Sequence, residues 1–170
     1  VKKAIENTVT VSRNEWKYVA ETVLDIPDNL PPLHCVPGDL NQALLNVIIN
    51  AAHSIEEKAA QGAGAKGLIR ISARADGGWI EIRISDTGAG IPDAIRDRVF
   101  EPFFTTKPIG KGTGQGLAIA QSVVADKHGG SIRFESAPGQ GATFIIRMPI
   151  RPENASPAGP ALAAGKGDNG

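Results

Sequence analysis

Two different periods of apolar residues run along this chain, and they separate its predicted helices from its predicted strands. Between Asp39 and Gly62, apolar residues recur three and four positions apart, which predicts one long amphipathic helix. Gln42 lies three residues after Asp39, which favours a capping box at the start of this helix, and Gly62 with Gly64 predicts its end. The apolar face consists of Leu44, Val47, Ile48, Ala51 and Ile55.

Alternation of apolar and polar residues predicts four strands, at 68–75, 79–86, 131–136 and 142–148. Turn residues at 76–78 and 138–141 join these strands into two hairpins. Weaker patterns predict a strand at 19–26 and helices at 3–14, 92–100 and 117–127. Helices and largely antiparallel strands in this order favour an α+β fold, a two-layer α/β sandwich.

Length and composition limit the chain to one core. With 170 residues, of which 41% are hydrophobic, it is long enough for one buried core and short for two. We expect one domain at 1–150. Residues 151–170 are rich in Pro, Ala, Gly and Asn, which is typical of a flexible tail or linker. The first residues look like the middle of a helix and suggest a piece of a longer protein.

The overall charge and the single cysteine argue against several classes of binding partner and metal site. The 18 basic and 18 acidic residues balance, which argues against nucleic acid or a membrane surface as a partner attracted by overall charge. Cys35, the single cysteine, forms no internal disulfide, and with the adjacent His34 it makes a poor zinc site. No signal peptide opens the sequence, and polar residues interrupt its longest uncharged run, at 41–55. We therefore expect a soluble cytoplasmic domain without membrane contact.

Two glycine-rich segments lie close together, DTGAGI at 86–91 and GKGTGQGL at 110–117. A P-loop requires a glycine where this chain has Thr105. The dinucleotide-binding fingerprint requires a glycine where it has Leu117. Both of these phosphate-binding motifs are therefore excluded, and the neighbouring residues must explain the two segments.

A polar stripe runs along the long predicted helix, opposite its apolar face. Gln42, Asn46, Asn50 and His53 fall within a quarter-turn of one another. Such a stripe is often a solvent-facing side, but solvent-facing helices usually display Lys and Glu rather than uncharged amides. The alternative is a stripe that lines a cleft, where amide oxygens can ligate Mg²⁺ carried by phosphates.

Asp86 follows the apolar face of the strand at 79–86, so alternation points its carboxylate towards the core. A buried carboxylate needs a basic side chain or a ligand donor. The glycines that follow, Gly88 and Gly90, would let a ligand approach the backbone closely. The alternative is an Asx turn that ends the strand.

Glycines at 112, 114 and 116 lead directly into the helix predicted at 117–127. The free N–H groups at the start of that helix predict an anion site. Lys107 and Lys111 lie in the preceding loop at 100–111, either closing over phosphates or merely solvated. The length of this loop favours a mobile lid.

Four segments in this order, LLNVIINAAHSI, DTGAGI, FEPFFTTK and GTGQGL, resemble the N, G1, F and G2 boxes of the catalytic ATP-binding domain of sensor histidine kinases. That domain belongs to the GHKL superfamily, with gyrase-type topoisomerases, mismatch-repair ATPases and a heat-shock chaperone. The resemblance covers roughly residues 1–150 and implies a Bergerat-type sandwich. In this fold a mixed, mostly antiparallel sheet is covered by helices on one face, and ATP lies between the N-box helix and the lid.

The resemblance also implies roles for individual residues. Asn50 ligates Mg²⁺ with Asn46 nearby, Asp86 accepts a hydrogen bond from the adenine amino group, and Asn50 and Lys107 serve phosphoryl transfer. The other implied nucleotide-binding positions are His53, Gly88, Gly90, Ile91, Thr106, Lys111, Gly112, Thr113, Gly114, Gln115, Gly116 and Leu117. The residues expected to anchor the lid are Phe100, Phe103 and Phe104.

Three positions differ from the residues that are common in this family. His53 stands where many relatives carry Lys, which makes a phosphate contact there weaker or pH-dependent. Gln115 replaces a common Leu. Ala142 stands where many members have Ser or Thr, which puts a water-mediated adenine contact in doubt.

The expected function is transfer of the γ-phosphoryl group of Mg-ATP to a histidine on a separate dimerisation domain, with a response regulator as an indirect partner. Gln42 occupies the place where the hydrolytic relatives use Glu, and an amide cannot accept the proton of an attacking water. None of His34, His53 and His128 precedes an acidic residue, so none resembles a kinase acceptor. The alternatives are a GHKL-type ATPase and a non-catalytic nucleotide-binding interaction module.

Overall fold

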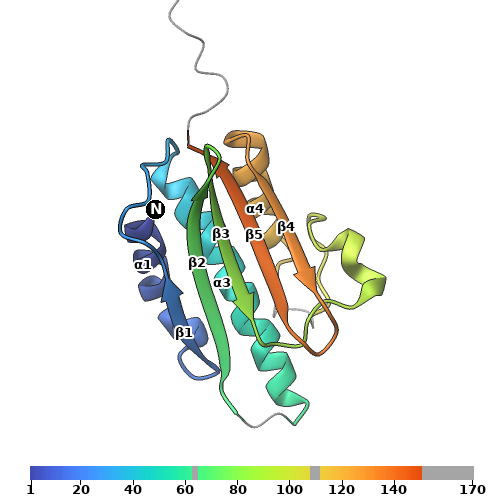
Figure 1. Ribbon diagram of the computed structural model, residues 1–170. Helices are drawn as coiled ribbons and strands as arrows, with labels where there is room; N and C mark the ends of the chain where they lie inside the picture. Colours follow the sequence, from blue (N-terminus) through green and yellow to red (C-terminus); the bar gives the residue numbers. More distant parts are fainter. Residues whose placement is uncertain (63–64, 108–111, 151–170) are drawn as a thin grey trace, which may run out of the picture.

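The computed structural model describes residues 1–62, 65–107 and 112–150. In these parts of the chain, a five-stranded sheet has the strand order β1-β2-β3-β5-β4. Helices α1, α3 and α4 all lie on one side of it (Figure 1). The strands are β1 (Ala20–Asp25), β2 (Gly67–Asp76), β3 (Trp79–Asp86), β4 (Ser131–Ser136) and β5 (Ala142–Pro149). The helices are α1 (Lys2–Val11), α2 (Arg13–Trp16), α3 (Pro37–Ala60), η1 (Asp93–Arg98), α4 (Gly116–Gln121) and η2 (Ser122–Lys127).

The sheet is mixed and mostly antiparallel, as expected. β1 pairs with β2 in parallel, and the other three pairings are antiparallel. Both predicted hairpins are present. At the β2–β3 turn, Gly77 and Gly78 have φ of 56° and 88°, the left-handed conformation that a two-residue hairpin turn requires and that glycine adopts at little cost.

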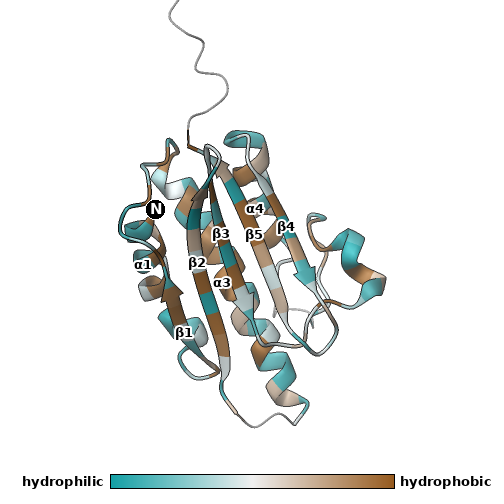
Figure 2. Cartoon of the chain, viewed as in Figure 1, coloured by the Kyte–Doolittle hydropathy of each residue, from teal (hydrophilic) through white to brown (hydrophobic). Residues whose placement is uncertain are grey.

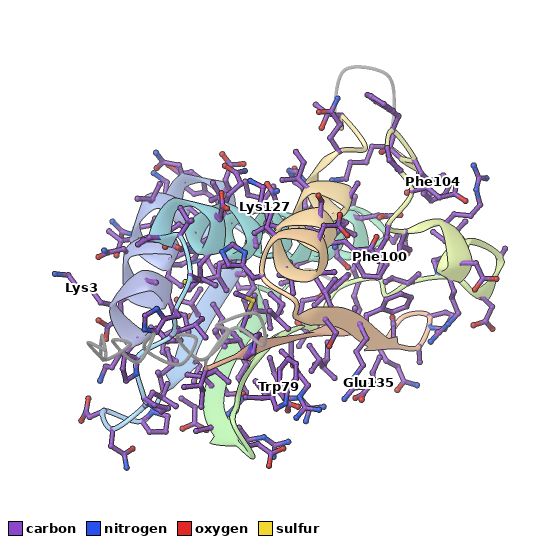
Figure 3. The ribbon with its side chains drawn as sticks, turned by 90° about the horizontal axis from the view of Figure 1, so that it is seen from above. Lys3, Trp79, Phe100, Phe104, Lys127 and Glu135 are labelled. Carbon is purple, nitrogen blue, oxygen red and sulfur yellow. The ribbon has the colours of Figure 1, made fainter. Side chains whose placement is uncertain are left out.

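The core lies between α3 and the covered face of the sheet. The predicted apolar face of α3 is buried there, with Leu44, Val47 and Ile48 fully inaccessible to solvent. Ile80, Ile82 and Ile84 of β3 face it from the sheet, and Figure 2 shows the alternation of hydrophobic and hydrophilic residues along the strands. Figure 3 shows the helices above the sheet and Trp79 and Glu135 on its uncovered face. The α+β two-layer sandwich is therefore confirmed.

The start of α3 differs from the prediction. The helix begins at Pro37, and its N-cap residue Val36 makes no side-chain cap hydrogen bond, so the predicted capping box at Asp39 is wrong. Proline suits this first position because its missing N–H has no partner there in any helix. Asp39 instead lies inside the first turn and pairs with Lys127 of η2 at 3.3 Å. This ion pair joins the start of α3 to the end of η2.

Three shorter helices also differ in detail. The helix predicted at 3–14 is divided into α1 and α2, and the one predicted at 92–100 is the 3₁₀-helix η1. The helix predicted at 117–127 begins as α4 and continues as η2, a π-helix. Periodicity does not distinguish these helix types over one or two turns, because their residues per turn differ too little.

No helix in the described residues is long and apolar enough to cross a membrane. Four sequence predictions concern residues outside the described ranges: the helix break at Gly64, the loop residues 108–110, the phosphate contact of Lys111 and the flexible tail at 151–170.

We expect Ile82→Ala to lower the free energy of unfolding by about 2 to 5 kcal/mol, because this central β3 side chain is fully buried and its loss leaves a cavity. Val23→Ala is the matched control. It also shortens an apolar strand residue, but Val23 is 39% exposed on the edge strand β1, so the change should stay within about 0.5 kcal/mol. Urea unfolding of both variants measures the difference, and equal losses would contradict the assigned core.

Candidate functional site

A cavity of about 670 Å³ opens beside α3, and six segments form its walls. These are one side of α3, the loop after β3, the η1 region at 95–99, residues 104–107, residues 112–117 and the β4–β5 turn with the start of β5. The predicted site residues that line the cavity are Asn46, Asn50, His53, Asp86, Gly90, Ile91, Thr106, Lys107, Gly112, Thr113, Gly114, Gly116 and Leu117. The structure thus gathers most of the predicted set around one space.

Two predicted positions within the described residues are not among the lining residues. Gly88 packs against α3 instead, where an added Cβ would lie 2.2 Å from Ser54 Oγ and 2.7 Å from the Ile55 backbone nitrogen. Its missing side chain therefore allows a close contact between loop and helix rather than the approach of a ligand. Gln115, the N-cap residue of α4, is exposed and does not line the cavity.

The polar stripe of α3 turns towards the cavity rather than towards open solvent. Asn46, Asn50 and His53 are half-buried in its wall. Gln42, at the start of the stripe, is exposed outside the cavity, and its amide donates to Asn46 Oδ1 at 3.1 Å. The amide nitrogen of Asn46 is buried and has no hydrogen-bond partner among the described residues. It is therefore a polar group that a bound ligand can satisfy.

Asp86 points inward at the end of β3, as the strand alternation predicts, and is only 6% exposed. Its Oδ1 accepts a hydrogen bond of 2.8 Å from the Gly88 N–H, which forms the Asx turn of the alternative interpretation. Its Oδ2 is buried and has no partner within the described parts of the chain. The Asx turn is therefore present, and the contact of the second oxygen with a ligand stays a prediction.

Burial dominates the electrostatics of this carboxylate. It raises the pKa of Asp86 above the usual 3.8, while hydrogen bonding from Gly88, Ser54 and Ala142 and, least, the charge of Lys58 act in the opposite direction. An ionised Asp86 without a full set of donors is costly in the folded protein. A ligand that offers an N–H to Oδ2 lowers this cost.

Gly90 lines the same end of the cavity and has φ of 75°. A Cβ at this position would lie 2.3 Å from the Ala137 carbonyl oxygen, so both conformation and space require glycine. The Gly139 N–H donates to the Ala89 carbonyl at 2.6 Å. The loop after β3 is therefore held against the β4–β5 turn.

Lys107 and His53 meet in another part of the cavity wall, where Lys107 Nζ lies 2.5 Å from His53 Nδ1. The ammonium donates, so the imidazole accepts in its neutral form. Burial lowers the pKa of both groups, and the charge of Lys107 lowers that of His53 further. The lysine is thus docked on α3 rather than solvated.

The glycine segment at 112–117 completes this part of the wall. Gly114 has φ of 65°, and a Cβ there would lie 2.4 Å from the carbonyl carbon of Phe103. At Gly116, where α4 begins, an added Cβ would lie 3.7 Å from Asn46, so this segment runs next to α3. Backbone N–H groups, a lysine and asparagine amides therefore surround one small volume, a combination suited to phosphate.

The three phenylalanines of the FEPFFTTK segment have different environments. Phe100 packs against the rings of Phe134 and Phe144, with centroid distances of 6.0 and 6.4 Å, and lies between the layers in Figure 3. Phe104 lines the cavity, with the Arg98 guanidinium 4.3 Å from its ring centroid. Phe103 is 71% exposed, so the prediction that it anchors the lid is wrong.

Several lining residues were missed by the sequence analysis. On α3 these residues are Ile49, Ser54, Glu57, Lys58 and Gln61. Glu57 and Gln61 continue the polar stripe at helical spacing, so following the same period for two more turns would have found them, whereas Ser54 and Lys58 lie towards the apolar face of the helix. Lys58 is the most strongly engaged, since its ammonium donates to the carbonyls of Thr87 and Gly139 at 3.0 and 2.8 Å.

Asp86→Asn should raise the free energy of unfolding at pH 7 by about 0.5 to 2 kcal/mol, because it removes a buried charge whose second oxygen has no described donor. The folded wild type binds this proton more tightly than the unfolded chain does, since burial raises the pKa. The stability that the folded wild type gains from this tighter proton binding is fully present below pH 3.8, and it is lost as pH rises through the folded pKa of Asp86. Urea unfolding between pH 4 and 8 should show the variant's gain shrinking as pH falls. A pH-independent difference, or a loss of stability, would contradict this account.

The chain matches the family model described as histidine kinase-, DNA gyrase B-, and HSP90-like ATPase over residues 35–152. The sensor histidine kinase ZraS of Escherichia coli K12 is 36% identical over 132 residues, which are 78% of this chain and 26% of ZraS. The chain thus spans about a quarter of the length of this relative.

Solved structures agree with the family match. The catalytic domain of the histidine kinase ThkA is similar with a TM-score of 0.74 and 26% identity, over 90% of this chain and 94% of that one. Full-length ShkA, solved in complex with AMPPNP, is similar with a TM-score of 0.69 and 28% identity, over 86% of this chain and 29% of that one. The described chain therefore has the GHKL fold, and it belongs to the family of histidine kinase-, DNA gyrase B- and HSP90-like ATPases.

Proposed function

We propose that this chain is the catalytic ATP-binding domain of a histidine protein kinase, which binds Mg-ATP and donates its γ-phosphoryl group to a histidine on a separate dimerisation domain. The observation that carries the proposal is the polarity of one cavity. One part of its wall, the carboxylate end, contains a buried carboxylate with an unpartnered oxygen, and another part, the phosphate end, contains a lysine with a glycine segment. Adenine has an amino donor and triphosphate is anionic, so ATP matches both ends.

At the carboxylate end, Asp86 Oδ2 accepts a hydrogen bond from the adenine amino group. Gly90 and Ile91 form the adjacent wall, and Ala142 adds a small apolar surface without a hydroxyl. A carbonyl in the place of the amino group would put two acceptors face to face. The site therefore favours adenine over guanine.

At the phosphate end, the N–H groups of the glycine segment and the Lys107 ammonium hold the phosphates. Lys107 must exchange His53 for a phosphate oxygen when nucleotide binds, and this exchange is favourable because a neutral acceptor is replaced by an anion. Thr106 and Thr113 supply hydroxyls to the same wall. These residues thus contribute to phosphoryl transfer by positioning the phosphates and neutralising their charge.

Magnesium fits this donor set as an ion that arrives with the phosphates. Within the described residues, no three His, Cys, Asp or Glu side chains gather to hold a metal ion by themselves. Asn50 offers one neutral amide oxygen in the cavity wall, with Asn46 one turn away, and hard oxygen donors are those that Mg²⁺ prefers. When bound, the ion neutralises charge on the transferring phosphoryl group.

Hydrolysis is the less supported activity. Gln42, at the position where the hydrolytic relatives are expected to have Glu, is an amide and lies outside the cavity. The acceptor histidine is also proposed to lie elsewhere. His128 accepts from the Val36 N–H at 3.2 Å and lies 2.8 Å from the Val123 carbonyl, which is a structural role. The dimerisation domain, the response regulator and a cytoplasmic location, either free or as part of a membrane-bound sensor, belong to this proposal.

Asn50→Ala should reduce phosphoryl transfer to a partner dimerisation domain by about two orders of magnitude or more while the fold survives, because the metal loses its protein ligand. Asn50→Asp should also abolish transfer, because it keeps an oxygen ligand but adds a negative charge beside the phosphates. Gln42→Ala is the matched control on the same helix and should retain transfer. The measurement is transfer from γ-labelled ATP, followed as acid-labile label on the partner. Inorganic phosphate release without label would indicate an ATPase, and ATP binding without either product would indicate a binding module.

Asp86→Asn should weaken ATP binding by about 10- to 100-fold, because a hydrogen bond to a charged group contributes about 1.5 to 3 kcal/mol. The variant should also discriminate less against GTP, since its amide can donate to the guanine carbonyl. Asp76→Asn, at an exposed strand end paired with Arg147, is the control and should bind both nucleotides as the wild type does. Calorimetric titration tests this, and unchanged ATP affinity in Asp86→Asn would place adenine elsewhere.

A further inference from the structure

Lys58 makes a contact that the proposed nucleotide chemistry does not use. It lies in the last turns of α3, in the cavity wall, and its ammonium donates to Thr87 O at 3.0 Å and to Gly139 O at 2.8 Å. These carbonyls belong to the loop after β3 and to the β4–β5 turn. One side chain therefore joins three segments of the wall.

The surrounding backbone shows what this junction holds. The Ala89 N–H donates to the Ser54 carbonyl of α3 at 3.0 Å, and the Ala89 carbonyl accepts from the Gly139 N–H at 2.6 Å. Gly88 lies directly against Ser54. Lys58 closes this ring of contacts around the loop that begins at Asp86, so its loss leaves two carbonyls without their charged donor.

Electrostatics place Lys58 at the carboxylate end of the cavity. Its charge lowers the pKa of Asp86. At the phosphate end, burial lowers the pKa of Lys107 and of His53, and the neighbouring charges that act on them are those of glutamates and, for His53, of Lys107. No carboxylate among the described residues forms an ion pair with Lys58. Its two loop carbonyls are its hydrogen-bond acceptors in this part of the molecule.

We infer that Lys58 is a positioning residue that clamps the loop after β3 to the β4–β5 turn and so fixes the base-binding wall around Asp86. This inference rests on the proposed function for its ligand, adenine, but the clamp itself belongs to the protein without nucleotide. Through it, the end of α3 sets the position of the carboxylate, while the middle of the same helix faces the phosphates.

The test compares three variants. Lys58→Met keeps the length and apolar stem and removes the donor. Lys58→Arg keeps a charged donor and serves as the rescue. Lys66→Met is the matched control, because Lys66 also donates to a backbone carbonyl, that of Lys17 at 3.1 Å, but does not line the cavity.

The first measurement is amide hydrogen exchange without nucleotide, read at Ala89 and Gly139. Lys58→Met should exchange about tenfold faster at these amides, with β3 and β5 amides unchanged as the internal reference. Lys58→Arg and Lys66→Met should match the wild type. Equal rates in Lys58→Met and wild type, or faster exchange spread evenly over the sheet, would overturn the clamp.

The second measurement is calorimetric titration with ATP and GTP. Lys58→Met should bind ATP about three- to tenfold more weakly and discriminate less against GTP, while Lys58→Arg and Lys66→Met stay within about twofold of wild type. Weaker binding without faster loop exchange would overturn the inference in favour of direct nucleotide contact, and faster exchange with unchanged binding would overturn the positioning role. If the wild type itself binds no ATP, the proposed function fails and the exchange experiment still decides the clamp.

Discussion

The arrangement of this domain depends on α3 serving the core and the cavity at once. Its apolar side packs on the sheet without solvent exposure, and its opposite side carries Asn46, Asn50 and His53 in the cavity wall. Close packing leaves the helix little freedom to shift or rotate. Polar groups on the far side are thereby held in place by hydrophobic burial, and the energy that folds the chain also orients the site.

Strand β3 also serves both the core and the cavity, but here burial destabilises the functional residue instead of only holding it in place. Alternation brings Ile80, Ile82 and Ile84 into the core, and continuing it by one step buries a carboxylate. Burial that stabilises an isoleucine destabilises an ionised aspartate. The Asx turn with Gly88 satisfies one oxygen, and the other remains without a described partner. Burying the carboxylate at the end of β3 therefore lowers the stability of the folded protein and leaves an acceptor that can recognise an N–H donor.

Periodicity was sufficient for the features that depend on burial. It predicted both hairpins, the apolar face of α3 and the inward direction of Asp86, because each follows from which side of an element is apolar. It was insufficient where close packing or backbone geometry decides. The packing of Gly88 on Ser54, the exposure of Phe103 and the π-helical turns of η2 all depend on neighbours distant in sequence. Lys58 was missed for a different reason, since helical spacing places it towards the apolar face of α3 rather than on the polar stripe.

Polar groups in the cavity follow a common pattern, in which incomplete satisfaction coincides with the positions that ATP is proposed to contact. Asp86 Oδ2 and the amide nitrogen of Asn46 are buried without described partners, and Lys107 has a neutral imidazole as its acceptor instead of an anion. If each of these groups had a full set of protein partners, the domain would be more stable without a ligand. A ligand would then have to displace those protein partners in order to bind. Leaving them partly paired costs stability in the free protein and lets binding recover it. Lys58 differs from them, because its two acceptors are backbone carbonyls. The cavity therefore combines groups that await a ligand with one that keeps the wall in place until it arrives.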